Sequence, residues 1–261
     1  MFEKISNTDE QLISDCRSLN LYKYIGENLD TFLLEMSEQK ATPREVLSTF
    51  LSKICSERDH NKAVMQLQRA SLPSDASFDN FDFSASHANE TLLRELCECR
   101  WVANHKNIVF QGDPGLGKTH LACALGREAL NRGYSTLFIS ANDLIAKLDK
   151  ARKEDVLDKQ IKQLRTYKVL IIDELGIPVR EYEHAASLMY TLIHARDMKA
   201  STIITSNREL CDWHKYLGHD RVSTNAWIDR FVGNGFYFHL TGPSYRLKGL
   251  ETHEIEFMND K

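Results

Sequence analysis

Two hydrophobic patterns follow each other along the chain. From residue 10 to about residue 69, apolar side chains recur at the spacing of an α-helix, as Phe50, Leu51 and Ile54 do, without strand-like alternation. The segment Thr42-Pro43-Arg44-Glu45 fits a helix start, with Thr as the N-cap, Pro at the first helical position and Glu at the third. This part of the sequence predicts a small helical module.

From about residue 88 onward, helical stretches alternate with short runs rich in β-branched and aromatic residues. The runs are Ile108-Val109-Phe110, Thr136-Leu137-Phe138-Ile139, Val169-Leu170-Ile171-Ile172, Thr202-Ile203-Ile204-Thr205 and Phe236-Tyr237-Phe238. Runs separated by helices are typical of parallel strands that right-handed crossovers join and that helices cover on both faces. This part predicts a three-layer α/β domain with a parallel sheet.

A polar segment, Ser71-Leu72-Pro73-Ser74-Asp75-Ala76-Ser77, separates the two patterns and breaks the helical period. Three phenylalanines that need burial follow it closely, Phe81 among them. The predicted domains are therefore residues 1–75, a helical module for contact with a partner or with DNA, and residues 76–261, the α/β domain.

The composition, with 42% hydrophobic and 27% charged residues among 261, is that of a globular protein. The longest aliphatic run, Val169–Ile172, is far shorter than the roughly 20 apolar residues that span a bilayer, and the first residues form no secretory leader. Six scattered cysteines indicate reduced thiols rather than a disulfide framework. We therefore expect a cytoplasmic protein with no membrane partner.

Charge is distributed unevenly. The net charge is −4, and residues 1–100 carry 11 Lys or Arg against 17 Asp or Glu. Neither half of the chain is basic enough to bind nucleic acid by charge alone, so a DNA contact needs a local patch. The best candidate lies on two consecutive helical stretches and consists of Lys147, Lys150, Arg152, Lys153, Lys159, Lys162 and Arg165. A solvated helix face, offset by Glu154, Asp155 and Asp158, is an equally good interpretation.

A glycine-rich segment directly follows the first strand of the α/β pattern. It reads Gly112-Asp113-Pro114-Gly115-Leu116-Gly117-Lys118-Thr119, and His120 continues it into a helix that ends before Gly133. The spacing matches the P-loop, in which backbone N–H groups turn towards a polyphosphate and the helix N-terminus adds its positive field. Lys118 would bridge the β and γ phosphates, and the Thr119 hydroxyl would ligate Mg²⁺. We therefore expect residues 112–120 to bind a nucleoside triphosphate.

Two carboxylates end the third buried run, which leads directly into Asp173 and Glu174. Adjacent charges at the C-terminal tip of a buried strand are costly unless they face a ligand crevice. Beside a P-loop, Asp173 would hold Mg²⁺ through water, and Glu174 would polarise the water that attacks the γ-phosphate. A P-loop kinase, which transfers phosphate to a hydroxyl, has less use for the second carboxylate.

Three further polar residues are candidates whose weight depends on context. Asn207 follows the run 202–205 and could orient the attacking water, although an Asn after a strand is usually a turn residue. Arg230 lies on a predicted helix over residues 225–232, and Arg246 follows the last strand. Neither arginine is near the phosphate motif in sequence, so a catalytic role for either depends on a family resemblance.

These segments together resemble the IstB-like ATPases, transposition helper proteins of the AAA+ superfamily that are similar to the DnaC-type helicase loaders. The resemblance covers roughly residues 80–250 and rests on Phe81-Asp82-Phe83-Ser84, Gly112–Ala122, Ala124–Ala129, Leu170–Gly176, Thr205–Arg208, Ile228–Arg230 and Gly242–Arg246, in that order. It implies a P-loop NTPase core of the AAA+ type, preceded by the small helical domain, that binds ATP and Mg²⁺.

The resemblance also implies roles for residues outside the P-loop. The strand that carries Asn207 would lie between the P-loop strand and the acidic strand, so that Asn207 acts as sensor one. Arg230 would be an arginine finger that reaches into the site of a neighbouring subunit, and Arg246 would be a second sensor in its own subunit. A finger supplied in trans makes hydrolysis conditional on assembly, so a homo-oligomer is expected.

Three functions are compatible with these inferences. The leading one is an ATP-hydrolysing transposition helper that assembles on DNA, expected to be non-specific duplex, and that activates or targets a partner transposase. The second is a DnaC-like loader of a replicative helicase, for which the same motifs serve and the partner differs. The third is a nucleotide-dependent DNA scaffold that does not hydrolyse ATP.

Overall fold

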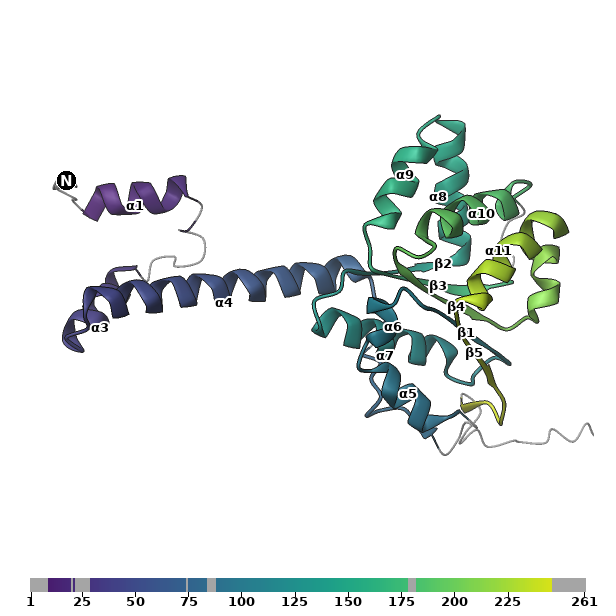
Figure 1. The fold of residues 1–261 in the computed structure, drawn as a ribbon, viewed down its shortest axis with the longest axis horizontal. Coiled ribbons are helices and arrows are strands. Elements are labelled where there is room, and N and C mark those ends of the chain that lie inside the picture. The colour runs from purple at the N-terminus through teal and green to yellow at the C-terminus, as the bar shows by residue number, and fades with distance from the viewer. Residues whose placement is uncertain are drawn as a thin grey trace, which may run out of the picture. The chain divides into compact units, whose positions relative to one another are not determined.

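The computed structural model describes residues 9–19, 21, 29–73, 75–83, 88–177 and 182–245 (Figure 1). Its contacts divide the chain into two units, residues 1–65 and residues 66–261. A single helix, α4 (Pro43–Ala70), carries residues of both units. The functional roles expected for the two parts of the chain stay predictions.

The N-terminal unit is helical. It contains α1 (Asp9–Ser18), α3 (Leu29–Glu38) and most of α4. The predicted start of α4 is confirmed, because the Thr42 hydroxyl accepts a hydrogen bond from the Glu45 N–H at 3.4 Å and a Glu45 carboxylate oxygen accepts one from the Thr42 N–H at 2.7 Å. This reciprocal pair is a capping box. Among the described residues, the buried core of the unit is small and centres on Ile54.

The second unit is built on a five-stranded parallel sheet. The strands are β1 (Asn107–Gly112), β2 (Thr136–Ser140), β3 (Val169–Leu175), β4 (Ser201–Ser206) and β5 (Gly235–Leu240). Their order is β2-β3-β4-β1-β5, and each neighbouring pair is parallel. The predicted α/β fold is confirmed, and β4 lies between the strand that precedes the P-loop and the strand that ends in the two carboxylates.

Helices cover both faces of this sheet and complete the three layers (Figure 1). One face packs against α5 (Glu90–Leu96), α6 (Arg100–Ala103) and α7 (Lys118–Asn131). The other packs against α8 (Ala141–Lys153), α9 (Leu157–Arg165), α10 (Ala185–Arg196), the 3₁₀ helix η3 (Leu210–Tyr216) and α11 (Arg221–Gly233).

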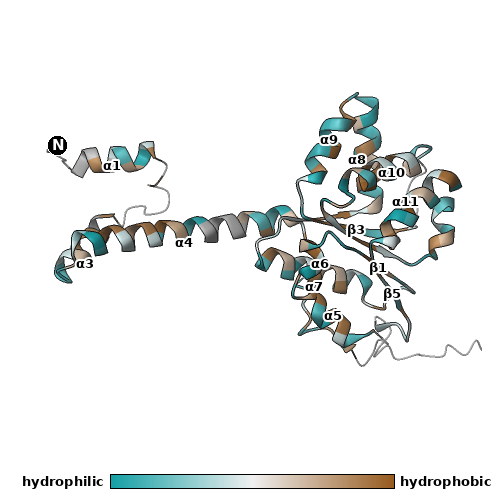
Figure 2. Ribbon diagram, viewed as in Figure 1, coloured by the Kyte–Doolittle hydropathy of each residue, from teal (hydrophilic) through white to brown (hydrophobic). Residues whose placement is uncertain are grey.

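The strands are apolar on both sides because each side faces a helical layer. In β1, Val109 belongs to one hydrophobic cluster, whereas its neighbours Ile108 and Phe110 belong to the other. This alternation follows from the two-residue period of a strand. In Figure 2, hydrophobic residues recur along the strands, whereas α9 carries mostly hydrophilic residues.

A buried arginine fastens the helical layer to the centre of the sheet. Arg196, at the end of α10, is 1% exposed. Its guanidinium donates to the carbonyl oxygens of Leu164, Tyr167 and Ser201 at 2.7, 3.0 and 2.5 Å. It also donates to the hydroxyl of Thr202 at 3.0 Å. Burial lowers the pKa of Arg196 to about 9, so the side chain is still charged at neutral pH.

All six cysteines are free thiols, as their scattered positions predict. Burial raises the pKa of Cys99 to about 11 and that of Cys123 to about 12, so both are protonated at neutral pH. Within the part of the chain that the structure describes, no helix has both the length and the apolar character that crossing a membrane requires.

Candidate functional site

The glycine-rich segment forms a tight loop between β1 and α7. Gly112, Gly115 and Gly117 have φ values of 150°, 85° and 80°, which side chains rarely allow. A Cβ atom on Gly115 would lie 2.0 Å from the Ser244 hydroxyl oxygen, and one on Gly117 would lie 2.5 Å from the Phe81 ring. Glycine is therefore required both by the backbone conformation and by the segments that close over the loop.

The helix after the loop begins at Lys118, as the P-loop pattern predicts, and Gly133 follows its end with a left-handed φ of 82°. Its N-cap is Gly117, which supplies no side-chain cap to the first turn. The N–H groups of a first turn have no partner within the helix, so they and the helix dipole favour an anion at this position. The Lys118 ammonium lies beside the loop and donates to the carbonyl oxygen of Asp113 at 2.7 Å.

Asp173 is joined to the P-loop helix by its carboxylate. Its Oδ1 accepts a hydrogen bond from the Thr119 hydroxyl at 2.8 Å and another from the Thr205 hydroxyl at 2.5 Å. Asp173 is only 7% exposed. Its carboxylate lies behind the side chains of Thr119 and Thr205 and is hydrogen-bonded to both hydroxyls. Residues that are far apart in sequence, on α7, β3 and β4, therefore meet at the carboxyl edge of the sheet.

Glu174 has a backbone conformation unlike that of its neighbours. The β3–β4 ladder pairs Ile172 with Ile204 and then Leu175 with Ser206, so Asp173 and Glu174 together face only Thr205. This extra residue makes a β-bulge, and Glu174 adopts a left-handed φ of 59°. In a regular strand adjacent side chains point to opposite faces, whereas a bulge re-aims one of them. Its exposed side chain lines the same cavity as Thr119.

Asn207 follows directly after β4 and lines the same cavity. Its side-chain oxygen Oδ1 is buried, and among the described residues it has no hydrogen-bond partner. A buried polar atom without a partner costs free energy, so its presence at a cavity wall points to a ligand or water that satisfies it.

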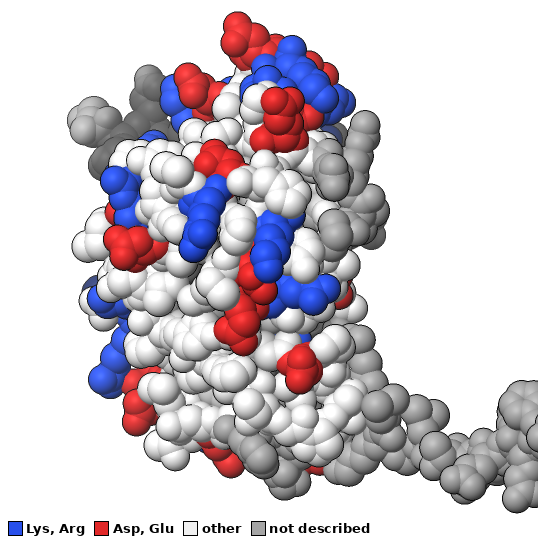
Figure 3. All heavy atoms as spheres, turned by 90° about the vertical axis from the view of Figure 1, so that its right-hand side faces the viewer, with Lys and Arg blue, Asp and Glu red and all other residues white. Residues whose placement is uncertain are grey.

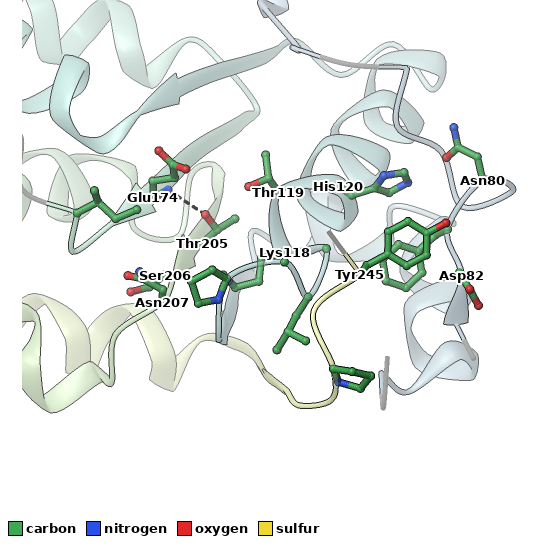
Figure 4. Close-up of a pocket in the computed structure, with 17 residues that line it drawn as sticks. Asn80, Asp82, Lys118, Thr119, His120, Glu174, Thr205, Ser206, Asn207 and Tyr245 are labelled. Carbon is green, nitrogen blue, oxygen red and sulfur yellow. Dashed lines mark hydrogen bonds between the residues drawn. The ribbon is translucent and has the colours of Figure 1, made fainter. Parts of the chain in front are cut away.

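These groups surround a cavity of about 300 Å³, shown in Figure 4. Its wall is formed by Asn80, Phe81, Asp82, the loop and helix start from Pro114 to His120, Glu174, Ile177, Thr205, Ser206, Asn207, Pro243 and Tyr245. The expected site residues Lys118, Thr119, Glu174 and Asn207 thus share one cavity, with Asp173 directly behind it.

Sequence reasoning did not identify one side of the cavity as a binding surface. It is built from the segment before α5 and the segment after β5, which meet at the P-loop. Phe81 lies 5.3 Å from the His120 ring, and the Tyr245 N–H donates to the Gly115 carbonyl at 3.0 Å. Two signals were available in the sequence, the requirement to bury Phe81 and the place of Phe81 and Tyr245 in segments that carry the family resemblance. Neither signal indicated that these segments meet at the P-loop, and nothing local indicated Asn80.

Of the two candidate arginines, the one that the structure describes lies outside this cavity. Arg230, on α11, is exposed and is not among the cavity-lining residues. One of its Nη atoms lies 2.7 Å from His194 Nδ1, and its guanidinium carbon lies 5.5 Å from the centre of the Tyr190 ring. Arg246 lies outside the described residues, which reach Tyr245 in this part of the chain.

The chemistry of the cavity fits a nucleotide and a hard cation. Backbone N–H groups at a helix start and the Lys118 ammonium suit phosphate oxygens. The Thr119 hydroxyl and the Asp173 carboxylate are oxygen donors of the kind that Mg²⁺ prefers. The rings of Phe81 and Tyr245, at the opposite end, offer apolar surface to a planar base.

The sheet order, the P-loop between β1 and α7, and the two carboxylates on the strand beyond β4 define the class of protein, a P-loop nucleotide-binding protein with the AAA+ fold. Solved structures agree with this fold. The crystal structure of DnaI matches with a TM-score of 0.52 and 20% identity over 65% of this chain and 90% of that chain. AMPPCP-bound DnaA from Aquifex aeolicus matches with a TM-score of 0.52 and 21% identity over 68% and 54%.

The chain belongs to the family of IstB-like ATP-binding proteins, whose model matches residues 16–252. An insertion sequence IS21 ATP-binding protein from Pseudomonas aeruginosa is 35% identical over 87% of this chain and 85% of its own length. An IS5376 ATP-binding protein from Geobacillus stearothermophilus is 35% identical over 82% and 86%. The predicted resemblance is confirmed, and the protein is an ATP-binding AAA+ protein of the insertion-sequence type.

Proposed function

We propose that this protein hydrolyses ATP and serves as the transposition helper of an insertion sequence, assembling on DNA and activating or targeting a partner transposase. The observation that carries the ATPase part is the junction of the P-loop helix with the acidic strand. The Thr119 hydroxyl oxygen and Asp173 Oδ1 are 2.8 Å apart, and Glu174 lines the same cavity as Lys118. A phosphate cradle, a pair of oxygen donors for a cation and a free carboxylate are the groups that hydrolysis requires.

Each residue has a distinct role in this proposal. Lys118 and the first-turn N–H groups of α7 bind the phosphates, and Thr119 and Asp173 hold Mg²⁺, which neutralises charge on the phosphate oxygens. Glu174 accepts a proton from the attacking water. Asn207, whose Oδ1 has no partner among the described residues, orients that water.

Assembly enters the proposal through Arg230. This arginine is exposed on α11 and does not line the cavity of its own chain, so it is available to the site of a second copy. Arginine fingers supplied in trans contribute about 10³ to 10⁵ in rate, so a site completed by a neighbour stays nearly inactive in the isolated subunit. Efficient ATP hydrolysis would then require that a homo-oligomer has formed. Arg246 is proposed as the second sensor.

The proposed DNA contact is the surface of α8 and α9. Four of its basic side chains are exposed and make no ion pair with any described residue, namely Lys147, Lys159, Lys162 and Arg165. By contrast, Arg152 and Lys153 contact the Asp149 carboxylate at 3.0 and 2.7 Å. Figure 3 shows basic and acidic side chains intermingled on one face of the α/β unit rather than a continuous basic surface. A few unpaired cations suit weak, sequence-independent contact with phosphates.

The identity of the partner rests on the relatives. Proteins that share 35% identity with this chain are named for insertion sequences, so the proposed partner is the transposase of such an element, in the cytoplasm. The likeness to DnaI, at 20% identity, extends to the fold alone. A helicase partner and a scaffold without hydrolysis are the two competing outcomes of the test below.

The test is ATP turnover by the purified protein, alone, with duplex DNA, and with DNA and an insertion-sequence transposase. We expect slow basal turnover that DNA and the transposase change, and turnover lower by about 10² to 10⁴ in Glu174→Gln. Wild-type protein that binds ATP but shows no turnover under any of these conditions would favour the scaffold. Stimulation by a replicative helicase and none by the transposase would favour the helicase loader.

A further inference from the structure

The bulge in β3 places two carboxylates beside one threonine. Between the pairs Ile172–Ile204 and Leu175–Ser206, β3 has two residues where β4 has only Thr205. The extra residue interrupts the regular ladder, so a backbone group of the bulge needs a partner outside it.

The Thr205 side chain is that partner. Its hydroxyl oxygen accepts a hydrogen bond from the Glu174 N–H at 2.9 Å, which Figure 4 marks with a dashed line. The same hydroxyl donates its proton to Asp173 Oδ1 at 2.5 Å. One side chain thus bonds the backbone of one carboxylate residue and the side chain of the other. Because Thr205 is 1% exposed, water does not compete freely for either bond.

The conformation of Glu174 is costly without such support. A non-glycine residue with φ near 60° is disfavoured, and such conformations persist where the surroundings hold them. The left-handed turn re-aims the Glu174 side chain at the point where the cavity begins. The N–H that fixes this turn is the one that Thr205 binds.

We propose that Thr205 is a positioning residue that holds Asp173 and Glu174 in register, so that the Glu174 carboxylate lines the cavity while the Asp173 carboxylate lies directly behind Thr119. This inference rests on the proposed ATP hydrolysis. The proposed positioning role belongs to the hydroxyl group of Thr205 and not to its methyl group. Thr205 also lines the cavity, but its hydroxyl proton is directed to Asp173 and its acceptor site is used by Glu174.

The substitutions Thr205→Ser and Thr205→Ala separate the hydroxyl from the methyl group. Serine keeps both hydrogen bonds, and alanine removes them without placing a methyl group close to Asp173, as valine would. A displacement of catalytic groups by about 1 Å can reduce the rate about a hundredfold. We expect kcat for ATP to fall between about tenfold and a hundredfold in Thr205→Ala, with KM changed less than about threefold, and Thr205→Ser to stay within about threefold of wild type.

Thr136 provides the matched control. It is also 1% exposed and lies in the same sheet, at the start of β2, but its hydroxyl donates to the carbonyl of Tyr134 at 3.3 Å, and it does not line the cavity. Thr136→Ser and Thr136→Ala remove the same groups from a buried strand. Neither should change kcat by more than about twofold, whatever their effect on stability.

A second readout does not need activity. Hydrogen exchange of the Glu174 amide, followed without nucleotide, should be at least about tenfold faster in Thr205→Ala than in wild type and Thr205→Ser. Both Thr136 variants should leave that amide unchanged. If Thr205→Ala does not fold, the exchange rate of this amide in Thr205→Ser, compared with wild type, takes its place and should be unchanged within about threefold.

Three results would overturn the role of Thr205: turnover of Thr205→Ala close to wild type, equal losses in the alanine and serine variants, or an unchanged Glu174 exchange rate in Thr205→Ala. If wild-type protein hydrolyses no ATP under any condition, the proposed function fails instead. The exchange experiment then decides the positioning role alone.

Discussion

Two polar regions of the α/β unit differ in how their side chains are held. At the carboxyl edge of the sheet, Asp173 and Thr205 are 7% and 1% exposed and hydrogen-bonded to each other. On α8 and α9 the basic side chains are exposed, and they contact nearby acidic residues or no described residue, as Lys150 with Glu154 at 3.8 Å and Lys159 with none.

The difference teaches what each region can do. Buried groups that are fixed before a ligand arrives need little reorganisation, and their interactions are strong because water is excluded. Exposed charges on long side chains are screened by salt and contribute little individually. We therefore expect substitutions at the carboxyl edge to change turnover by orders of magnitude, and substitutions on α8 and α9 to change DNA binding gradually and with salt.

The largest effect is expected for Lys118→Ala at the carboxyl edge. Loss of the ammonium removes charge-assisted hydrogen bonds to phosphate, so ATP affinity should fall at least about a hundredfold and turnover should cease. A titration with a fluorescent ATP analogue measures the affinity, with Lys199→Ala as the control for loss of an exposed lysine. Retained affinity in Lys118→Ala would refute the assignment of the phosphate cradle.

Arg230→Ala tests the comparison between buried and exposed groups most directly. Arg230 is exposed like the lysines of α9, yet we expect its loss to change turnover strongly. We expect intact ATP binding and a loss of turnover of about 10³-fold, since a finger acts in the site of the neighbouring subunit. Mixing with Lys118→Ala subunits, which still donate their own Arg230, should restore part of the activity. Absence of rescue at every mixing ratio would argue against a finger supplied in trans.

Glu174→Gln tests the base at the carboxyl edge. The amide cannot accept a proton, so kcat should fall by about 10² to 10⁴ while ATP still binds and the assembled state persists. Single-turnover kinetics and nucleotide titration measure the two properties, with Glu95→Gln on α5 as the control. Near-normal turnover would assign the base to another residue.

Arg196 links the C-terminal end of α9 to the start of β4, away from the carboxyl edge, because it bonds the carbonyls of Leu164, Tyr167 and Ser201. Arg196→Leu leaves buried carbonyls without a donor, so the free energy of unfolding should decrease by about 3 kcal/mol. Urea denaturation measures this, and Arg196→Lys should lie between leucine and wild type. A decrease below about 0.5 kcal/mol would mean that water replaces the guanidinium.

The smallest effect is expected on α9. Charge reversal in Lys159→Glu/Lys162→Glu should weaken binding of duplex DNA uniformly over sequences and reduce the slope of log affinity against log salt by about 2. Fluorescence anisotropy at several salt concentrations measures the slope. The double variant Arg94→Glu/Arg100→Glu, on the opposite layer, should leave the slope unchanged. An unchanged slope in the α9 variant would mean that this face of α9 does not contact DNA.

Much of the candidate site could be predicted because it is local in sequence. The P-loop is one continuous segment, and Asp173 and Glu174 are adjacent at the end of a β-branched run. The P-loop and the pair of carboxylates each lie at the carboxyl end of a parallel strand, and such ends meet at one edge of a sheet. The position of β4 between β1 and β3 came from the family resemblance, and the structure confirms it.

Other parts of the site could not be predicted, because they depend on contacts between distant segments. Asn80 and Tyr245 lie 165 positions apart by their numbers and share a cavity wall only after the chain folds around the P-loop. Thr205 looked like the end of an ordinary buried run, and Arg196 like one of many helix arginines. Their roles depend on a bulge and on carbonyl groups that no sequence pattern marks.

By itself the sequence determined the order of the elements, the phosphate-binding loop and the two carboxylates, because hydrophobic period and motif spacing act over neighbouring residues. The tertiary structure alone decided that Thr205 bonds both carboxylate residues, that Asp173 lies behind Thr119, and that Arg230 does not line the cavity of its own chain. The physical reason is that register, burial and hydrogen-bond partners arise only when separate strands and helices pack together.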